Sequence, residues 1–93
     1  MTYSSIIQDD LSVCFVCGRY GTEIHHVFFG TANRKLSDKY GCVVGLCAEH
    51  HRGKNGVHQN RELDLKIKRI GQECFTKAYP QDDFLAVFGR NYL

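Results

Sequence analysis

Two short pairs of metal-ligand residues constrain the fold of this 93-residue chain more than any other feature of its sequence. Cys14 and Cys17 form one pair, and Cys47 and His50 form the other, each with two residues between its ligands. Two such turns from distant parts of a chain can complete a closed tetrahedral Cys3His zinc shell. A chain of this length has a thin hydrophobic core, and a bound ion would add folding free energy to it. We therefore expect these four residues to hold a structural Zn2+ ion.

Two other interpretations of the cysteines remain open. They could be buried reduced thiols that act as small hydrophobic residues, or the first pair could be redox-active, which would not explain the matching second pair. The chain has five cysteines, and an odd number does not suit a simple disulfide framework. Outside the pairs, Cys74 falls on the apolar stripe of a predicted helix and is expected in the core, whereas the sequence does not place Cys42.

Composition indicates a single soluble globular domain over residues 1–93. Hydrophobic residues make up 43% of the chain and charged residues 24%, and no apolar run approaches the roughly 20 residues of a membrane span. The N-terminal decapeptide lacks the basic start and long apolar stretch of a signal peptide, so we expect a cytoplasmic protein without a membrane partner. The net charge is only +2. Although basic residues crowd into positions 52–69, charge alone favours a solvated helix face over nucleic-acid binding.

The first half of the chain predicts short strands of an α+β fold. Residues 11–17 and 22–29 are apolar and rich in β-formers, which favours a hairpin with the first cysteine pair near its turn. Residues 42–47 form a third extended segment. Residues 30–41 are polar and flanked by glycines, which predicts a loop with a helical turn at 37–40.

The second half predicts helices. A short helix begins within residues 48–53, and Asn60 is a suitable N-cap for an amphipathic helix over residues 61–79. Pro80 ends that helix, and residues 82–89 predict a short final helix. The apolar stripe of the long helix recurs at a spacing of three to four residues: Leu63, Ile67, Ile70, Cys74 and Ala78.

Four histidines remain once His50 is assigned to zinc, and they indicate a second site. A lone histidine is more often structural than a ligand, but four in so small a chain change that balance. His25 and His26 should have different roles, because neighbouring side chains on a strand point to opposite faces. One can enter a metal shell while the other accepts a proton nearby. His51 projects about 100° from His50 on a helix, towards a second site, and His58 returns after a glycine-rich turn.

The segments CFVCGRYGTEIHHVFFG and VVGLCAEHH together resemble the zinc-stapled HNH endonucleases, also called ββα-metal or His-Me finger nucleases. The match covers a motif core of residues 14–58, followed by a C-terminal helical part, residues 60–93. More narrowly, the chain is similar to phage-encoded HNH proteins such as the recombination-enhancing, RecA-dependent nucleases. The resemblance implies a small zinc-stapled ββα-metal domain with a C-terminal amphipathic helix and a short final helix. It also implies a metal-dependent DNA endonuclease that hydrolyses phosphodiester bonds.

The resemblance also assigns roles to individual histidines. The first histidine of the family's pair binds the catalytic metal and the second is the general base, so His25 is expected as a ligand and His26 as the base. The last histidine of the motif falls on His51, a second ligand. Many members add a ligand four residues later, which here is Asn55. We expect a short insertion and take His58 as the third ligand, with Asn55 as the alternative.

The middle Asn of the motif is missing, because its usual position falls on Cys42. Asn33 is the nearest candidate to replace it in its supporting role. Imidazole ligands favour Zn2+, Ni2+ or Mn2+ as the catalytic ion, and Mg2+ stays open because phosphate and water would complete the shell. We expect basic and polar residues near the two histidine segments to hold DNA phosphates in sequence-neutral, salt-sensitive contacts: Arg34, Lys35, Arg52, Lys54 and Asn55.

DNA is thus the expected substrate, and a recombinase or another phage or host DNA-processing protein is an expected partner. The expected location is the cytoplasm of a bacterial host, with the protein encoded by a phage or prophage. The stripe of the long helix could pack inward or form a homodimer face. The alternative function is a non-catalytic zinc-binding module for nucleic acid or protein, which needs no second metal. A cysteine-based redox or hydrolytic enzyme is a third alternative, but no cysteine outside the pairs has an activating context.

Overall fold

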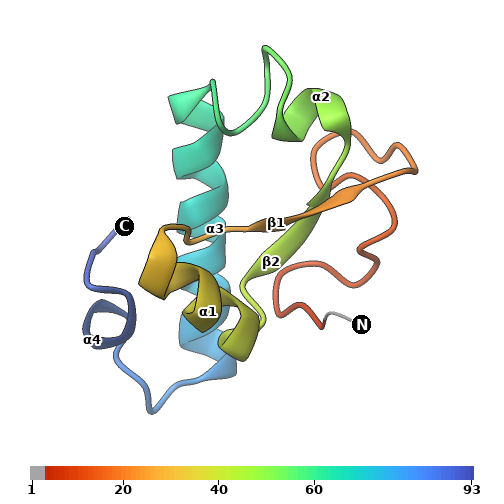
Figure 1. Ribbon diagram of the computed structural model, residues 1–93. Coiled ribbons are helices and arrows are strands. Elements are labelled where there is room, and N and C mark those ends of the chain that lie inside the picture. Colours follow the sequence, from red (N-terminus) through yellow and green to blue (C-terminus); the bar gives the residue numbers. More distant parts are fainter. Residues whose placement is uncertain (1–3) are drawn as a thin grey trace.

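The computed structural model describes residues 4–93, so the first three residues of the N-terminal decapeptide lie outside the description. Figure 1 shows a two-stranded sheet beside one long helix, with the smaller helices around them. The elements in chain order are β1 (Glu23–His26), α1 (Thr31–Tyr40), β2 (Val43–Leu46), α2 (Ala48–His51), α3 (Arg61–Ala78) and α4 (Phe84–Phe88). The α+β class expected from the sequence is confirmed. None of the helices described within residues 4–93 is long and apolar enough to span a bilayer.

The two strands pair antiparallel and differ in burial. Every residue of β2 is buried, as its continuous apolar sequence requires. In β1 only His25 is buried, while His26 beside it is partly exposed. The register places His25 opposite Val44 and His26 opposite Val43. The sheet therefore directs the two adjacent histidines to opposite faces, as strand geometry demands.

The expected hairpin between residues 11–17 and 22–29 is wrong. The first segment forms only one isolated bridge, between Val13 and Tyr20, and β1 pairs with β2 instead. The backbone turns tightly here, since the N–H of Gly18 donates to the carbonyl of Cys14 at 2.8 Å. Gly18 also has a φ of 76°, in the left-handed region that favours glycine. A backbone bent around its cysteine pair cannot continue as a ladder of paired residues.

The helical turn expected at residues 37–40 is confirmed, but the loop expected for the rest of residues 30–41 is wrong, because the helix α1 begins at Thr31. It ends at Gly41, whose φ is 75° and whose N–H donates to the carbonyl of Ser37. Ser37 is completely buried, and its hydroxyl donates to the carbonyl of Phe28 at 2.7 Å. Only Leu36 and Tyr40 of α1 pack against the hydrophobic core. The helix is therefore docked by one buried polar contact and only two apolar side chains, a pattern that a search for apolar periodicity does not detect.

The long helix α3 begins where the sequence predicts. The side chain of Asn60 accepts a hydrogen bond from the N–H of Leu63, which confirms it as the N-cap. The buried face differs from the expected stripe, because Ala78 is exposed and the polar residues Lys68 and Gln72 are buried. At Gly71 an added Cβ would lie 3.2 Å from the side chains of Phe28 and Val27, so this position allows a close approach of α3 to the segment after β1.

An aromatic cluster fastens the C-terminus to this framework. Phe84 and Phe88 of α4 are buried and lie 5.0 and 4.6 Å from the ring of Phe28, measured between ring centroids. Phe75 of α3 packs against both rings of α4. Edge and tilted ring contacts of this kind add stability beyond the area that they bury. The chain segment that follows the two histidines of β1 therefore packs against both α3 and α4.

Candidate metal centres

The first centre brings together the four residues expected to bind zinc: Cys14, Cys17, Cys47 and His50. Their ligand atoms all lie within 4.8 Å of one another. The Sγ atoms of Cys17 and Cys47 are 3.8 Å apart, and the Nδ1 of His50 lies 3.3 Å from the Sγ of Cys47. A tetrahedral zinc site with Zn–S bonds of about 2.3 Å has S–S edges of about 3.8 Å. This cluster could hold a metal ion such as zinc.

Local backbone geometry prepares the cysteines of this first centre for a metal. Cys47 caps α2, and its carbonyl accepts hydrogen bonds from the N–H groups of His50 and His51. Burial by itself would raise the pKa of Cys14, but backbone N–H groups of Cys47, Cys17 and Val16 lower that pKa to about 6. The thiolate is the form of cysteine that binds metal. The turn therefore stabilises the ligand form of Cys14.

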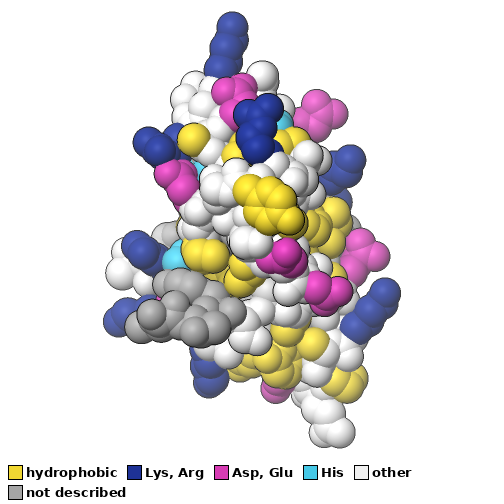
Figure 2. All heavy atoms as spheres, turned by 90° about the vertical axis from the view of Figure 1, so that its right-hand side faces the viewer, with side chains coloured by type: hydrophobic (Ala, Val, Ile, Leu, Met, Phe, Trp, Pro, Cys, Tyr) yellow, Lys and Arg dark blue, Asp and Glu magenta, His cyan; other side chains and the backbone are white. Residues whose placement is uncertain are grey.

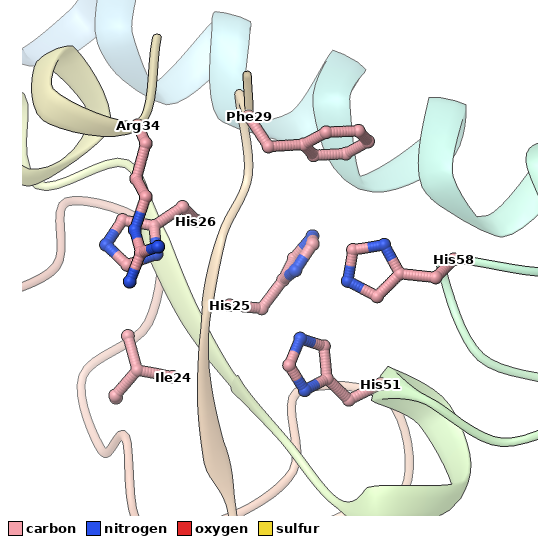
Figure 3. A pocket seen from close by; sticks show the side chains of 7 residues that line it. All are labelled: Ile24, His25, His26, Phe29, Arg34, His51 and His58. Carbon is pink, nitrogen blue, oxygen red and sulfur yellow. The ribbon is translucent and has the colours of Figure 1, made fainter. Parts of the chain in front are cut away.

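The second centre is formed by His25, His51 and His58, which come from β1, α2 and the segment before α3. One nitrogen of each ring lies within 4.8 Å of the others, and the ring centroids are 5.0 to 5.3 Å apart. Figure 3 shows the three rings turned towards one another. Asn55, the alternative third ligand, donates instead to a carboxylate oxygen of Glu49 at 3.1 Å. The structure thus brings together the three histidines that the sequence proposed as ligands, without Asn55.

His25 has the protonation state that a metal ligand needs. It is only 3% exposed, and its Nε2 is buried without a hydrogen-bond partner among residues 4–93. Burial, followed by the neighbouring His51 and His58, lowers the pKa of His25 from 6.5 to about 3. A buried polar atom without a partner costs free energy. A metal ion bound to the neutral imidazole would remove that cost.

A carboxylate contacts the ring of His51. The Nδ1 of His51 lies 2.7 Å from the Oε1 of Glu23. Two N–H groups of Arg52 donate to the two oxygens of the same carboxylate, at 3.0 and 2.7 Å. Hydrogen bonds from Arg52, and then from His51, lower the pKa of Glu23 to about 2. Arg52, expected to bind phosphate, thus pairs with Glu23 while its side chain stays 67% exposed, and its contact with phosphate stays a prediction.

A buried cation lies behind the second centre. The Nζ of Lys68 is 3.8 Å from the centroid of the Phe29 ring and 2.6 Å from a carboxylate oxygen of Asp64. The Phe29 ring in turn lies 6.0 and 5.6 Å from the rings of His25 and His58. Lys68 is also one of the groups that lower the pKa of His25. This environment keeps the ring of His25 neutral, so that one of its two nitrogens has a lone pair available for a metal ion.

A cavity of about 230 Å3 connects the second centre with His26. Its walls are Ile24, His25, His26, Phe29, Arg34, His51 and His58. In Figure 3, β1 runs between His25 on one side and His26 with Arg34 on the other. The Nε2 of His26 is 2.7 Å from a carboxylate oxygen of Asp38 in α1. A volume of this size has room for a phosphate group and several waters, since one water occupies about 30 Å3.

The other predicted residues lie outside this cavity. Lys35 and Lys54 are exposed on the surface, and Asn33 is partly buried in α1. Cys42 is completely buried, and burial raises the pKa of its thiol to about 12. Cys74 is half-buried on α3. Neither of these two cysteines belongs to a metal-ligand group of the described chain.

Sequence reasoning missed two carboxylates that contact the histidines. Glu23 precedes His25 by two residues on the same strand, and that spacing places both side chains on one face. This signal was available in the sequence. Asp38 gave no such signal, because its contact with His26 depends on α1, which the sequence did not predict.

Charge on the molecular surface is mixed. On the face drawn in Figure 2, Lys and Arg side chains alternate with Asp and Glu, in line with the net charge of +2. Comparison with known proteins adds no assignment: no family model, no curated protein and no solved structure matches the chain. The case for a function therefore rests on the geometry and chemistry of the two centres.

Proposed function

We propose that this chain is a metal-dependent DNA endonuclease of the HNH type, with a structural zinc in the first centre and a catalytic divalent ion in the second. One observation carries the proposal: the ligand atoms of His25, His51 and His58 lie within 4.8 Å of one another, and His26 shares their cavity. Three imidazoles leave coordination positions open for substrate, as catalytic sites require. A purely structural site would be closed by a fourth protein ligand. The antiparallel strands followed by a ligand-bearing helix also fit the ββα-metal arrangement that the sequence resembles.

The proposed general base is His26. The Nε2 of His26 lies 2.7 Å from a carboxylate oxygen of Asp38, a contact that would orient the ring to take a proton from the attacking water. General-base catalysis by a positioned imidazole contributes roughly 10²- to 10⁴-fold to a rate. A divalent ion held by the three histidines would stabilise the charge of the phosphoryl transition state and of the leaving 3′ oxygen. His26 would thus act as the base, and the other three histidines would hold the ion. His25 and His26 lie on opposite faces of β1, so the two roles stay separate.

Arg34 is the proposed phosphate contact nearest to the chemistry. It lines the cavity beside His26 and reaches it from the first turn of α1. Lys35 follows it on the exposed surface of the same helix, and Lys54 is a further exposed candidate, three residues after His51 in the sequence. Such contacts hold the DNA backbone without reading its sequence. A recombinase partner, a homodimer and a phage origin remain proposals from the sequence.

A metal-titrated nicking assay tests this function. Supercoiled plasmid, single-stranded DNA and branched DNA are incubated with the full chain and Mg2+, Mn2+, Ni2+ or Zn2+. We expect cleavage by the wild type and a loss of at least about 100-fold in His26→Ala, with unchanged zinc content and melting temperature. The variant also controls for contaminating nucleases, because their activity would survive the substitution.

The outcomes are distinct. A folded, zinc-loaded wild type that cuts no substrate with any of these ions would contradict the nuclease and favour the non-catalytic zinc module. Cleavage by His26→Ala at the wild-type rate would contradict the assignment of the base, since the observed cleavage would then not depend on His26.

A further inference from the structure

The Glu23 carboxylate connects the strand β1 with the helix α2 at the edge of the second centre. We propose that Glu23 and Arg52 form a positioning pair that holds the ring of His51 in the orientation and tautomer required for metal binding. The inference rests on the second metal centre of the proposed function. It assigns to Arg52 a role inside the protein in addition to the expected contact with DNA phosphate.

The hydrogen bonds specify one tautomer of His51. Because both oxygens of an ionised carboxylate only accept hydrogen bonds, the Nδ1 of His51 must donate its proton to Oε1 of Glu23. The lone pair of the neutral ring is then on Nε2. The rings of His25 and His58 lie 5.2 and 5.0 Å from that of His51, between centroids. A carboxylate that orients a ligand histidine in this way is a recurrent feature of metal sites, and its loss typically weakens metal affinity about 10- to 100-fold.

The sheet register brings Glu23 to this position. Glu23 pairs with Leu46, the last residue of β2, and the next residue, Cys47, begins the turn into α2. Glu23 therefore lies beside the helix that carries His51. Glu23 and His25 are two residues apart on β1, so their side chains lie on the same face of the strand. That face therefore carries both the candidate ligand His25 and the carboxylate that contacts the neighbouring ligand His51.

Arg52 completes the arrangement by fixing the carboxylate itself. Its Nε donates to Oε1 and its Nη2 to Oε2 of Glu23, the paired geometry in which arginine recognises a carboxylate. Glu23 is one-third exposed, so without Arg52 its side chain would be free to rotate towards solvent. Arg52 follows His51 directly in the sequence, and α2 therefore carries both partners of the carboxylate.

Metal titration without DNA separates this positioning role from a phosphate contact. The full chain, loaded with one equivalent of Zn2+ in the first centre, is titrated calorimetrically with Ni2+, an ion suited to imidazole ligands. We expect Glu23→Gln to raise the Kd for Ni2+ by about 10- to 100-fold. Glu49→Gln is the matched control, because it removes the same charge from an exposed position of α2 and should change the Kd by less than about twofold.

Arg52→Ala supplies a test of sign. If charge alone mattered, removal of a nearby cation would tighten the binding of Ni2+. A positioning role predicts weaker binding, by at least about threefold, because the released carboxylate no longer fixes His51. Tighter or unchanged binding in Arg52→Ala would overturn the role of Arg52. Equal Kd values for Glu23→Gln and Glu49→Gln would overturn the role of Glu23.

A spectroscopic measurement guards against a general loss of structure. In the zinc-loaded wild type without Ni2+, the ¹⁵N chemical shifts of His51 should report a proton on Nδ1, and Glu23→Gln should show a mixture of tautomers with an unchanged melting temperature. A wild type with the proton on Nε2 would overturn the inference. If Ni2+ binding depends on Glu23 but no DNA is cut, the nuclease proposal fails and this inference stands. If DNA is cut and Glu23→Gln binds Ni2+ as the wild type does, only the inference fails.

Discussion

The buried imidazole of His25 makes stability depend on pH in a way that can be worked out from the structure. Burial and the neighbouring histidines lower its pKa from 6.5 to about 3. Because the folded pKa lies below the unfolded value, protons bind preferentially to the unfolded chain, and stability is lost progressively as the pH falls below about 6.5 towards about 3. When the pH is lowered from about 7.5 to about 5.5, His25 alone should reduce the free energy of unfolding by about 1.4 kcal/mol. Most of this change falls in the pH unit below the unfolded pKa of 6.5, where the slope approaches about 1.36 kcal/mol per pH unit.

Urea unfolding followed by circular dichroism at a series of pH values measures this effect. The samples carry zinc in the first centre and no other divalent ion, so that the second centre is free of metal. We expect the wild type to lose about 1.4 kcal/mol more than His25→Gln over this pH window. The pH dependence is the readout, so a constant loss of stability from the substitution does not affect it. Parallel curves for the two proteins would refute the claim that His25 is held as a buried neutral ring.

Two further predictions concern the zinc centre and the DNA contact. Cys14→Ser should lose zinc and melt at least about 10 °C lower, because a structural zinc supplies folding free energy. The control Cys74→Ser should keep its zinc, and mass spectrometry measures the zinc content of both variants. A fully folded, zinc-free Cys14→Ser would contradict the structural role of the zinc. Arg34→Ala combined with Lys35→Ala should reduce the slope of log Kd against log salt for DNA by about 1 to 2, since each phosphate contact contributes about 0.9. The control Lys77→Ala, on the far end of α3, should leave the slope unchanged, and an unchanged slope in the double variant would place the phosphate contacts elsewhere.

The residues of both centres could be found in the sequence, because ligand chemistry is expressed in residue type and spacing. Cys14 and Cys17, like Cys47 and His50, have a separation that lets one turn supply two ligands. The helix α3 was equally predictable, since its Asn60 cap and apolar spacing are local signals. The association of His58 with the other histidines was expected from the family resemblance only by assuming a short insertion, and the structure brings their rings together.

The missed features depend on contacts between distant parts of the chain. Residues 11–17 have the composition of a strand, but the turn around the cysteine pair overrides that local preference. α1 is docked by the buried hydroxyl of Ser37 and by only two apolar side chains, Leu36 and Tyr40, so its polar sequence resembles a loop. Asp38 acquires its contact with His26 only once that helix exists. Tertiary contacts of this kind have no local sequence pattern.

The proposed function depends on His25, His51 and His58 together holding one divalent ion, separate from the zinc of the first centre. Anomalous X-ray diffraction from crystals of the zinc-loaded protein soaked in Ni2+ tests it most directly. We predict two peaks: a zinc peak among the four residues of the first centre, and a nickel peak about 2.1 Å from one nitrogen of each of the three imidazoles. A zinc peak alone, with the three rings apart or unliganded at millimolar Ni2+, would contradict the account.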